Sequence, residues 1–267
     1  MIVKCNKADE EAIFSYIGDN YPSCLYLYLN LKKFGIESEK IAVFKQEKNN
    51  CITSVLLKYY SCIHVFSEKN DFDGEELGLF IEAGKFSMVY CTAKTVELIY
   101  PALPEKKRSK ASLSMGWVAR IEKIDKQPKG TAVEADTNDF EQIVHLIYND
   151  DDIGRSYKYD ELAKQLIERN RSGYARNLVI KENDLVIAHA CTNAETIKIA
   201  VVAELLVRSN YRRQGYASEI WRDLCCRLLS ENKEVFSFYY SVESRALHKK
   251  IGFYEICEWG KIVITDN

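Results

Sequence analysis

The 267-residue sequence lacks several features that would place it in a specialised class of protein. No apolar run approaches the roughly 20 residues that a membrane-spanning helix needs, and the mean hydropathy is −0.26. The N-terminal segment carries acidic side chains where a secretory signal peptide needs an unbroken apolar run. We therefore expect a cytoplasmic protein with no membrane partner.

Closely spaced metal ligands and paired cysteines are also missing. The nine cysteines form no C-x-x-C pair and are odd in number, which favours reduced thiols over a disulfide framework. Cys225 and Cys226 are adjacent in a helical pattern, where neighbouring side chains diverge by about 100°, so packing explains them better than metal binding. His64, His145 and His189 each stand alone in apolar or strand-like segments, which favours structural roles. We predict no metal site.

An excess of charge of one sign is absent as well. The chain has 37 Lys and Arg against 39 Asp and Glu, a net charge of −2, with a pI near 6.2. A protein that binds nucleic acid through its overall field carries a basic excess, so we expect no nucleic-acid partner. The Gly-Lys-Ser/Thr of the phosphate loop and the G-x-G-x-x-G of dinucleotide-binding proteins are missing too.

What is present is a readable order of elements from Thr131 onward, β-α-α-β-β-β-α-β-α-β. Asp136 is the expected N-cap of the first of these helices, and Asn183-Asp184 is expected to make a tight hairpin turn. The expected strands are 131–135, 175–182, 185–192, 197–207, 234–241 and 255–264. The expected helices are 136–150, 158–170, one that begins near Gly215 or Ala217 and runs to 229, and 244–251.

The first half shows a weaker version of the same order. Residues 40–68 contain three strand-like runs with Asn49-Asn50 as a turn, followed by a helix over 73–85, a strand over 86–92, a helix over 93–103 and a strand over 114–124. We treat this as a weak internal repeat. A polar linker from Asp125 to Gly130 would then separate a domain over 1–125 from a domain over 131–267.

The stretch from Val201 to Leu229 joins a strand to an amphipathic helix through a polar turn. The unsatisfied backbone N–H groups at the start of that helix, with arginines beside them, indicate an anion site. Gly215 lets a ligand approach the backbone without a side chain in the way. The alternative is an ordinary small-residue turn with arginines on the surface.

Two stretches of the second half resemble the GNAT superfamily of acyl-CoA N-acyltransferases. The family pattern Q/R-x-x-G-x-G/A is matched by Arg212 to Ala217. The family pattern N-x-x-A-x-x-L-Y-x-x-x-G-F is matched by "SVESRALHKKIGF", residues 241–253, with Ser241 in place of the asparagine and His248 in place of the tyrosine. The resemblance covers about residues 131–264.

This resemblance implies an α/β (α+β) fold and, with the repeat, two GNAT-like lobes, each a mixed, mostly antiparallel twisted sheet flanked by helices. It implies acetyl-CoA (coenzyme A) as cofactor, with the pyrophosphate on the amides of the turn and the pantetheine arm beside the preceding strand. The residues implied for cofactor binding are Leu205, Leu206, Val207, Arg212, Arg213, Gln214, Gly215, Tyr216, Ala217, Ser218, Ser241, Ser244 and Leu247.

Transfer of an acetyl group to an amine also needs a base and an acid. Glu204, the only acid in "IKIAVVAELLV", is the candidate base; its alternative is a solvent-facing or arginine-paired glutamate. His248 is the candidate acid, with Tyr239 and Tyr240 as fallback donors; its alternative is a surface histidine beside Lys249 and Lys250. Tyr148, Tyr157, Tyr159 and Tyr174 either line an acceptor pocket or are ordinary core and surface residues.

In the first lobe, the counterpart of the phosphate-binding turn carries acids at Asp71, Asp73, Glu75 and Glu76. Acids complement a helix N-terminus but repel a polyanion, so we predict no cofactor there.

We therefore predict an acetyl-CoA-dependent N-acetyltransferase that acts by direct attack in a ternary complex on a small-molecule or peptide amine, as a monomer or homodimer. The alternative is a catalytically silent coenzyme A-binding regulatory protein, and a purely structural module is a third reading.

Overall fold

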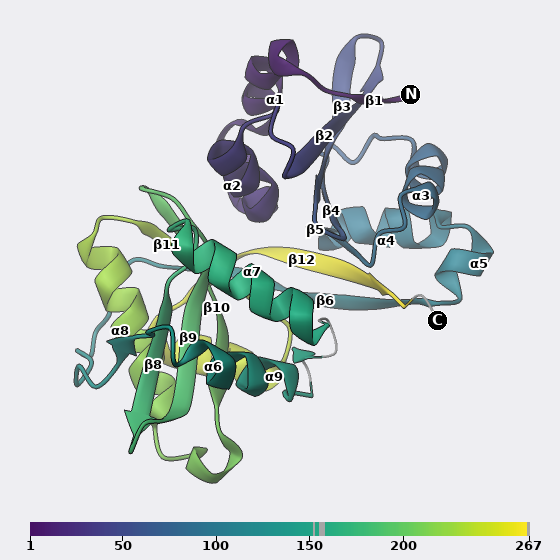
Figure 1. Cartoon of the computed structure of the whole chain (residues 1–267). Helices are drawn as coiled ribbons and strands as arrows, with labels where there is room; N and C mark the ends of the chain where they lie inside the picture. Colours follow the sequence, from purple (N-terminus) through teal and green to yellow (C-terminus); the bar gives the residue numbers. More distant parts are fainter. Residues whose placement is uncertain (152, 155–157, 266–267) are drawn as a thin grey trace. The chain divides into compact units, whose positions relative to one another are not determined.

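The computed structural model describes residues 1–151, 153–154 and 158–265. Its residues gather into two compact units, which Figure 1 shows in sequence colours. The first unit comprises Met1–Val118, Tyr239–Ser241 and Glu255–Asn267, and the second comprises Ala119–Phe238 and Val242–Tyr254. Each unit is a twisted, mostly antiparallel sheet flanked by helices, which confirms the predicted fold class.

The first unit has the strand order β1-β2-β3-β4-β5-β12-β6. The first unit has two hydrophobic cores, one on each face of its sheet, because successive side chains of β3 point to opposite faces. Val55 and Leu57 pack under α1 and α2, whereas Leu56 packs with α3 and α4 on the other face. The bounds are β1 Ile2–Lys4, α1 Glu10–Ile17, α2 Leu25–Phe34, β2 Ile41–Lys48, β3 Cys51–Tyr59, β4 Cys62–Phe66, α3 Gly74–Ala83, β5 Met88–Thr92, α4 Ala93–Ala102, α5 Glu105–Arg108, β6 Ala111–Ile121 and β12 Tyr254–Ile264.

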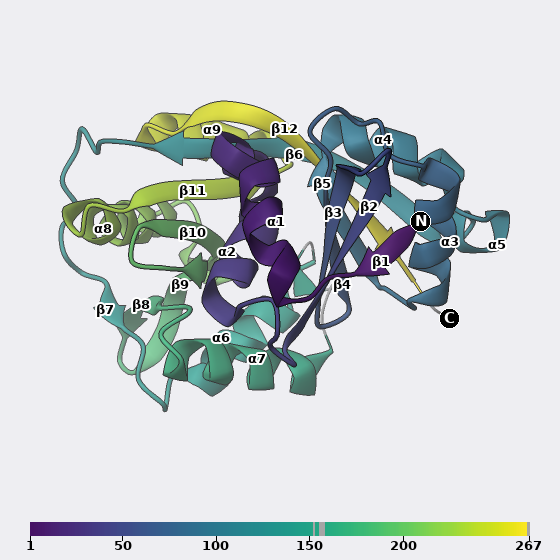
Figure 2. The ribbon, with the colours of Figure 1, turned by 90° about the horizontal axis from the view of Figure 1, so that it is seen from above.

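The second unit has the strand order β11-β10-β9-β8-β7. Helices α6 and α7 cover one face of this sheet, where they pack on Val179, Val186 and Leu206 of the strands. Helix α8 covers the other face (Figures 1 and 2). The bounds are β7 Val133–Glu134, α6 Phe140–Tyr148, α7 Tyr159–Arg171, β8 Asn177–Glu182, β9 Leu185–Glu195, β10 Ile199–Val207, α8 Tyr216–Ser230, β11 Glu234–Tyr239 and α9 Val242–Ile251.

The two halves of the chain repeat one order of elements. The sequence indicated this repeat weakly, and only from residue 40 of the first half onward. A strand, two helices, three strands, a helix, a strand, a helix and a final strand run from β1 to β6 and again from β7 to β12, with α5 as an addition in the first half. Each half has one parallel pair among the described strand pairs, and in both cases a single helix connects the two strands. These pairs are β4 and β5, connected by α3, and β10 and β11, connected by α8.

Strand β12 follows the second unit in the chain but is part of the first unit. All of β12 except Tyr254 is counted with the first unit, where it pairs with β5 from Trp259↔Thr92 to Val263↔Met88. Ile262 and Ile264, 0% and 3% exposed, complete the core around α3 and α4. Conversely, the last three residues of β6 are counted with the second unit. There Arg120 pairs with Glu234 of β11 at 3.0 Å.

One helix start differs from its prediction. Asp136 does not cap α6; its side chain accepts a hydrogen bond from Asn138 N at 2.7 Å and closes a turn instead. The N-cap residue is Asp139, whose carboxylate pairs with Lys181 at 2.7 Å rather than bonding to the helix amides. A short Asp-Thr-Asn-Asp stretch offers two capping positions, and the apolar face that packs on the sheet begins only at Phe140.

Candidate functional site

The site is built where β10 leaves its parallel neighbour. The pairing of β10 with β11 runs from Ile199↔Glu234 to Val202↔Ser237, and β10 continues to Val207 beyond it. On its other side β10 pairs with β9, with a shift in register between Ala203 and Leu206. Two residues of β10 therefore stand opposite one of β9, a β-bulge. Glu204 lies in this bulge with φ +53, in the left-handed region.

The turn after β10 is held from within. Arg212 donates from Nε to the Val207 carbonyl at 3.0 Å, although most of its side chain is exposed. Gln214 donates to the Asn210 carbonyl at 3.2 Å. Arg213 and Gly215 have φ +63 and +93, so two residues of the turn adopt the left-handed backbone conformation before α8 begins. The result is an exposed, ordered loop that leads directly into the helix.

The N-terminus of α8 is open. Its N-cap residue is Gly215, which supplies no side-chain cap. No hydrogen bond among the described residues is donated by the backbone N–H groups of residues 213–218. Apart from its two chain neighbours, a Cβ placed on Gly215 would meet no atom within 4 Å, so the surface at this residue is open. A run of unsatisfied amides at a helix N-terminus beside arginines suits an anionic group.

A hollow of about 470 Å³ lies next to this turn. Leu206, Val207 and Arg212 line it from β10 and the turn, and His145 and Asp150 line it from the end of α6. Three of the residues expected to bind a cofactor thus face one space. Leu205 and residues 216–218, which flank these residues in the sequence, are half-buried. Ser244 and Leu247, on α9, are half-buried as well. Ser241 is counted with the first unit, so its role stays a prediction.

Glu204 is almost buried, 9% exposed, and does not face bulk solvent as one alternative expected. Its Oε2 accepts a hydrogen bond from the Cys191 thiol at 3.3 Å. The carboxylate borders a small chamber under α7, about 10 Å³, which is the space of about one water. Arg169 and Asn177 line the same chamber.

His248 is 5% exposed, so it is not the surface histidine that its lysine neighbours suggested. Its Nδ1 lies 2.7 Å from the Ser244 carbonyl, which can only accept, so Nδ1 carries the proton and Nε2 accepts from Ser237 Oγ at 2.8 Å. Trp221 and Phe253 pack against the ring. Burial lowers the pKa of His248 to about 4. At neutral pH it is an uncharged core histidine, an arrangement that does not favour the acid role.

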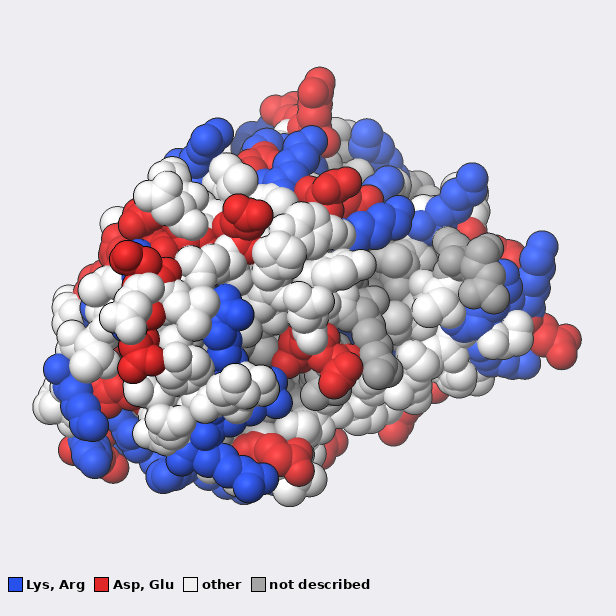
Figure 3. Space-filling view, turned by 60° about the horizontal axis from the view of Figure 1, so that its bottom comes forward, with Lys and Arg blue, Asp and Glu red and all other residues white. Residues whose placement is uncertain are grey.

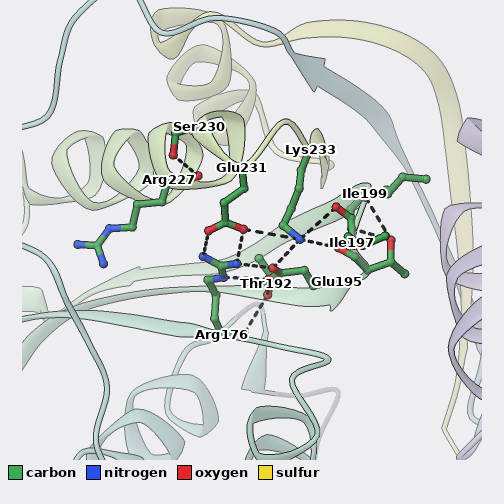
Figure 4. A network of polar contacts seen from close by, with 10 residues as sticks. Arg176, Thr192, Glu195, Ile197, Ile199, Arg227, Ser230, Glu231 and Lys233 are labelled. Atoms are coloured by element: carbon green, nitrogen blue, oxygen red, sulfur yellow. Dashed lines mark hydrogen bonds and ion pairs between the residues drawn. The ribbon is translucent and has the colours of Figure 1, made fainter.

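The closed end of the β10/β11 pair is fixed by a polar network, which Figure 4 shows from close by. The Arg176 guanidinium bridges Glu195 and Glu231, and Lys233 Nζ lies 3.3 Å from Glu195 and 2.6 Å from the Thr196 carbonyl. These residues join the start of β8, the end of β9 and the α8–β11 connection. The side chains of Glu195 and Lys233 are buried, so the network fixes β10 and β11 at the end where they are paired, opposite to the end where Glu204 lies.

One face of the molecule shows mixed charge. Lysine, arginine and acidic side chains are interspersed on the face seen in Figure 3. Within the described ranges, no group of three or more His, Cys, Asp or Glu is arranged to hold a metal ion. In the same residues, none of the helices has the length and apolar character required to span a bilayer.

Residues 140–253 match the family model described as the acetyltransferase (GNAT) family. This segment is therefore similar to the GNAT acetyltransferases, over less than half of the chain. It contains the β10 bulge, the open turn, α8 and α9, so the match and the geometry select the same part of the chain. No curated protein sequence shows significant similarity to the chain.

Solved structures extend the likeness of fold to both halves. A GNAT-family acetyltransferase from Colwellia psychrerythraea is similar with a TM-score of 0.60 and 11% identity, over 99% of this chain and 100% of that one. A tandem GNAT protein from the clavulanic acid biosynthesis pathway gives 0.57 and 9%, over 100% and 99%. A Drosophila protein gives 0.69 and 8%, over 99% and 98%. The predicted resemblance to the GNAT superfamily is confirmed, and the likeness of fold to a tandem GNAT protein covers the whole chain.

Among the described residues, the start of α3 in the first lobe is capped, unlike the start of α8. Asp73 caps α3 through a hydrogen bond from Glu76 N at 3.0 Å. Gln46 donates to Glu76 Oε2 at 2.8 Å, and the backbone N–H of Ile2 donates to Glu76 Oε1 at 2.5 Å. Side chains of the first lobe thus occupy the N-terminus of α3, whereas the backbone amides at the N-terminus of α8 in the second lobe stay open.

Sequence reasoning missed two contributors to the site. His145, expected to be structural, is exposed and lines the hollow, whereas His64 and His189 are buried as expected. Cys191, which contacts Glu204, carries no local signal because it lies on a different strand. Tyr148 is 43% exposed and packs on Tyr159, Tyr174 is 1% exposed, and Tyr157 lies outside the described residues.

Proposed function

We propose that the protein is an N-acetyltransferase that moves an acetyl group from acetyl-CoA to a primary amine by direct attack. The observation that carries this proposal is the open α8 N-terminus, where the amides of residues 213–218 have no acceptor among the described residues and the surface at Gly215 is open. Its position after the diverging end of β10 and within the segment that matches the GNAT family model supports coenzyme A as the ligand.

The residues present fit that ligand. The backbone amides of 213–218 would bind the diphosphate, with Arg212 and Arg213 adding positive charge. The β10 segment Leu205–Val207, no longer paired with β11, would offer backbone groups to the amides of the pantetheine arm. When bound, acetyl-CoA supplies an activated acetyl group as a thioester.

The protein's own chemistry would centre on Glu204. An alkyl ammonium has a pKa of about 10.4 and must lose a proton before it attacks, and a carboxylate near the reacting centre accepts that proton directly or through a water. Glu204 lies on the strand segment proposed to hold the pantetheine arm. With Nδ1–H donated to Ser244, neutral His248 has no free proton to give, so we do not propose it as the acid.

One observation favours a second candidate, a catalytically silent coenzyme A-binding regulator. The residue in the family's tyrosine position, His248, is buried and uncharged at neutral pH. Such a protein would bind coenzyme A through the same turn but release no thiol.

The test is calorimetric titration of the protein with acetyl-CoA, followed by thiol release against a panel of small amines and peptide N-termini. The variant Arg212→Glu/Gly215→Asp should abolish binding, whereas Glu204→Gln should bind normally and release thiol far more slowly. Binding without thiol release would favour the regulator. Absence of binding by the wild type would refute both candidates.

A further inference from the structure

The Glu204 carboxylate has a thiol as one of its hydrogen-bond donors. Cys191 Sγ lies 3.3 Å from Glu204 Oε2 and 3.6 Å from the carbonyl oxygen of Ala203, its partner in register across the strands. Cys191 is 2% exposed. Burial and the Glu204 charge raise the pKa of Cys191 well above its usual range. The thiol therefore stays protonated and remains a donor at any working pH.

The setting limits the help that solvent can give. The chamber beside the two side chains has room for about one water, and Leu162 and Leu166 of α7 close it. The bulge places Glu204 in the left-handed region, which costs a residue with a side chain about 1–2 kcal/mol. The orientation of the carboxylate therefore depends on the few groups that contact it.

A thiol differs from the usual donors in strength. Hydrogen bonds to a carboxylate favour its charged form, so strong donors make it a poorer base. The S–H group is a weak donor. It directs the carboxylate while leaving most of its basicity, which suits a group that must take a proton from an ammonium ion.

We propose that Cys191 is a positioning residue for the reaction: its thiol orients the Glu204 carboxylate without much weakening it as a base. This inference rests on the proposed function, because it takes Glu204 as the base. It assigns Cys191 no contact with substrate and no covalent step.

The first experiment measures the contact itself and needs no activity. The S–H stretch of Cys191 is isolated in the infrared difference spectrum of wild type minus Cys191→Ser. We expect its frequency below that of the fully buried control thiol Cys225, isolated with Cys225→Ser. In a Glu204→Gln background the Cys191 band should move up, because a neutral amide is a weaker acceptor. A Cys191 band that ignores Glu204→Gln overturns the proposal.

The second experiment measures the role through the pH profile of kcat. Cys191→Ala removes the donor, so the acidic limb should move up by about 0.5–1 pH unit and kcat should fall about 5- to 20-fold with KM for acetyl-CoA unchanged. Cys191→Ser supplies a stronger donor, so the limb should move down and kcat should stay within about threefold of wild type. Cys225→Ala, a matched loss of a buried thiol, should move neither quantity.

A double-mutant cycle separates positioning from folding. In a Glu204→Gln background, Cys191→Ala should cause no further fall in kcat. An equal fall in both backgrounds, or a limb that stays in place in both Cys191 variants, overturns the proposal. An inactive wild type would instead refute Glu204 as a base and the positioning role with it, and a Cys191 band that still responded to Glu204→Gln would show that the contact itself is real.

Discussion

The sharpest prediction compares two glycines of the second unit. Gly215, before α8, has φ +93, and Gly173, after α7, has φ +66. A Cβ added at either position would meet no atom within 4 Å, so neither Gly215→Ala nor Gly173→Ala introduces a clash. The two substitutions differ in one respect: only Gly215 stands before the amides proposed to bind a diphosphate.

The expected loss of stability is therefore similar for both variants. Alanine in the left-handed region costs about 1–2 kcal/mol, and with open space around the methyl group no further term is expected. The affinity for coenzyme A should diverge. A methyl group at Gly215 keeps the diphosphate from close approach to the backbone, and we expect at least a tenfold loss, about 1.4 kcal/mol.

Urea unfolding and calorimetric titration with coenzyme A measure the two quantities on the same samples. Gly173→Ala should lose stability and keep its affinity. If Gly215→Ala binds as tightly as the wild type, the ligand does not approach the backbone at this turn and the proposed site is wrong. If both variants lose affinity equally, the loss reflects stability alone and the reasoning from the open helix N-terminus fails.

Three further predictions concern the scaffold. Glu195→Gln leaves the charges of Arg176 and Lys233 without their buried partner and should lower the free energy of unfolding by about 2–3 kcal/mol, whereas Asp125→Asn, in a pair more than four-fifths exposed, should change it by less than about 0.5 kcal/mol. Folding lowers the pKa of His248 from 6.5 to about 4, so between pH 4 and 6.5 the unfolded chain binds more protons than the folded chain. The contribution of neutral His248 to the free energy of unfolding is therefore full above pH 6.5 and is lost as the pH falls to 4. The gap in stability between wild type and His248→Gln should narrow by up to about 3 kcal/mol from pH 6.5 to 4; a constant gap would contradict the assignment. Ile262→Ala should cost about 2–4 kcal/mol and speed amide hydrogen exchange in β5 and α4 rather than in β8 to β10.

Local patterns predicted most of the elements because local rules govern them. The Asn49-Asn50 and Asn183-Asp184 turns have φ values of +53, +61, +49 and +64, which asparagine and aspartate tolerate better than most residues. The apolar face of α8 and the strand that precedes it followed from periodicity in the same way. The turn between them could be located from Gly215 and its arginines, which need no distant partner to be recognised.

What the sequence did not reveal depends on distant contacts. His248 stands beside two lysines, yet Trp221 and Phe253 from other elements bury its ring. The "VVAELLV" run gives no sign of a bulge at Glu204, because the bulge arises from the register with β9. Helices α1 and α2 were not predicted, and neither was the pairing of β12 with β5, which joins residues far apart in the chain.

The place of β12 also has a consequence for how the protein is made. The first half needs Ile262 and Ile264 to finish its core, and these residues are synthesised only after β7 to β11 of the second unit. At about 5–20 residues per second, the edge of β5 waits roughly 7–30 s after β6 is synthesised before β12 is available to pair with it. An open edge is a template for pairing with other chains. The first unit, although most of its residues precede those of the second, thus keeps an open edge at β5 until the second unit has been synthesised.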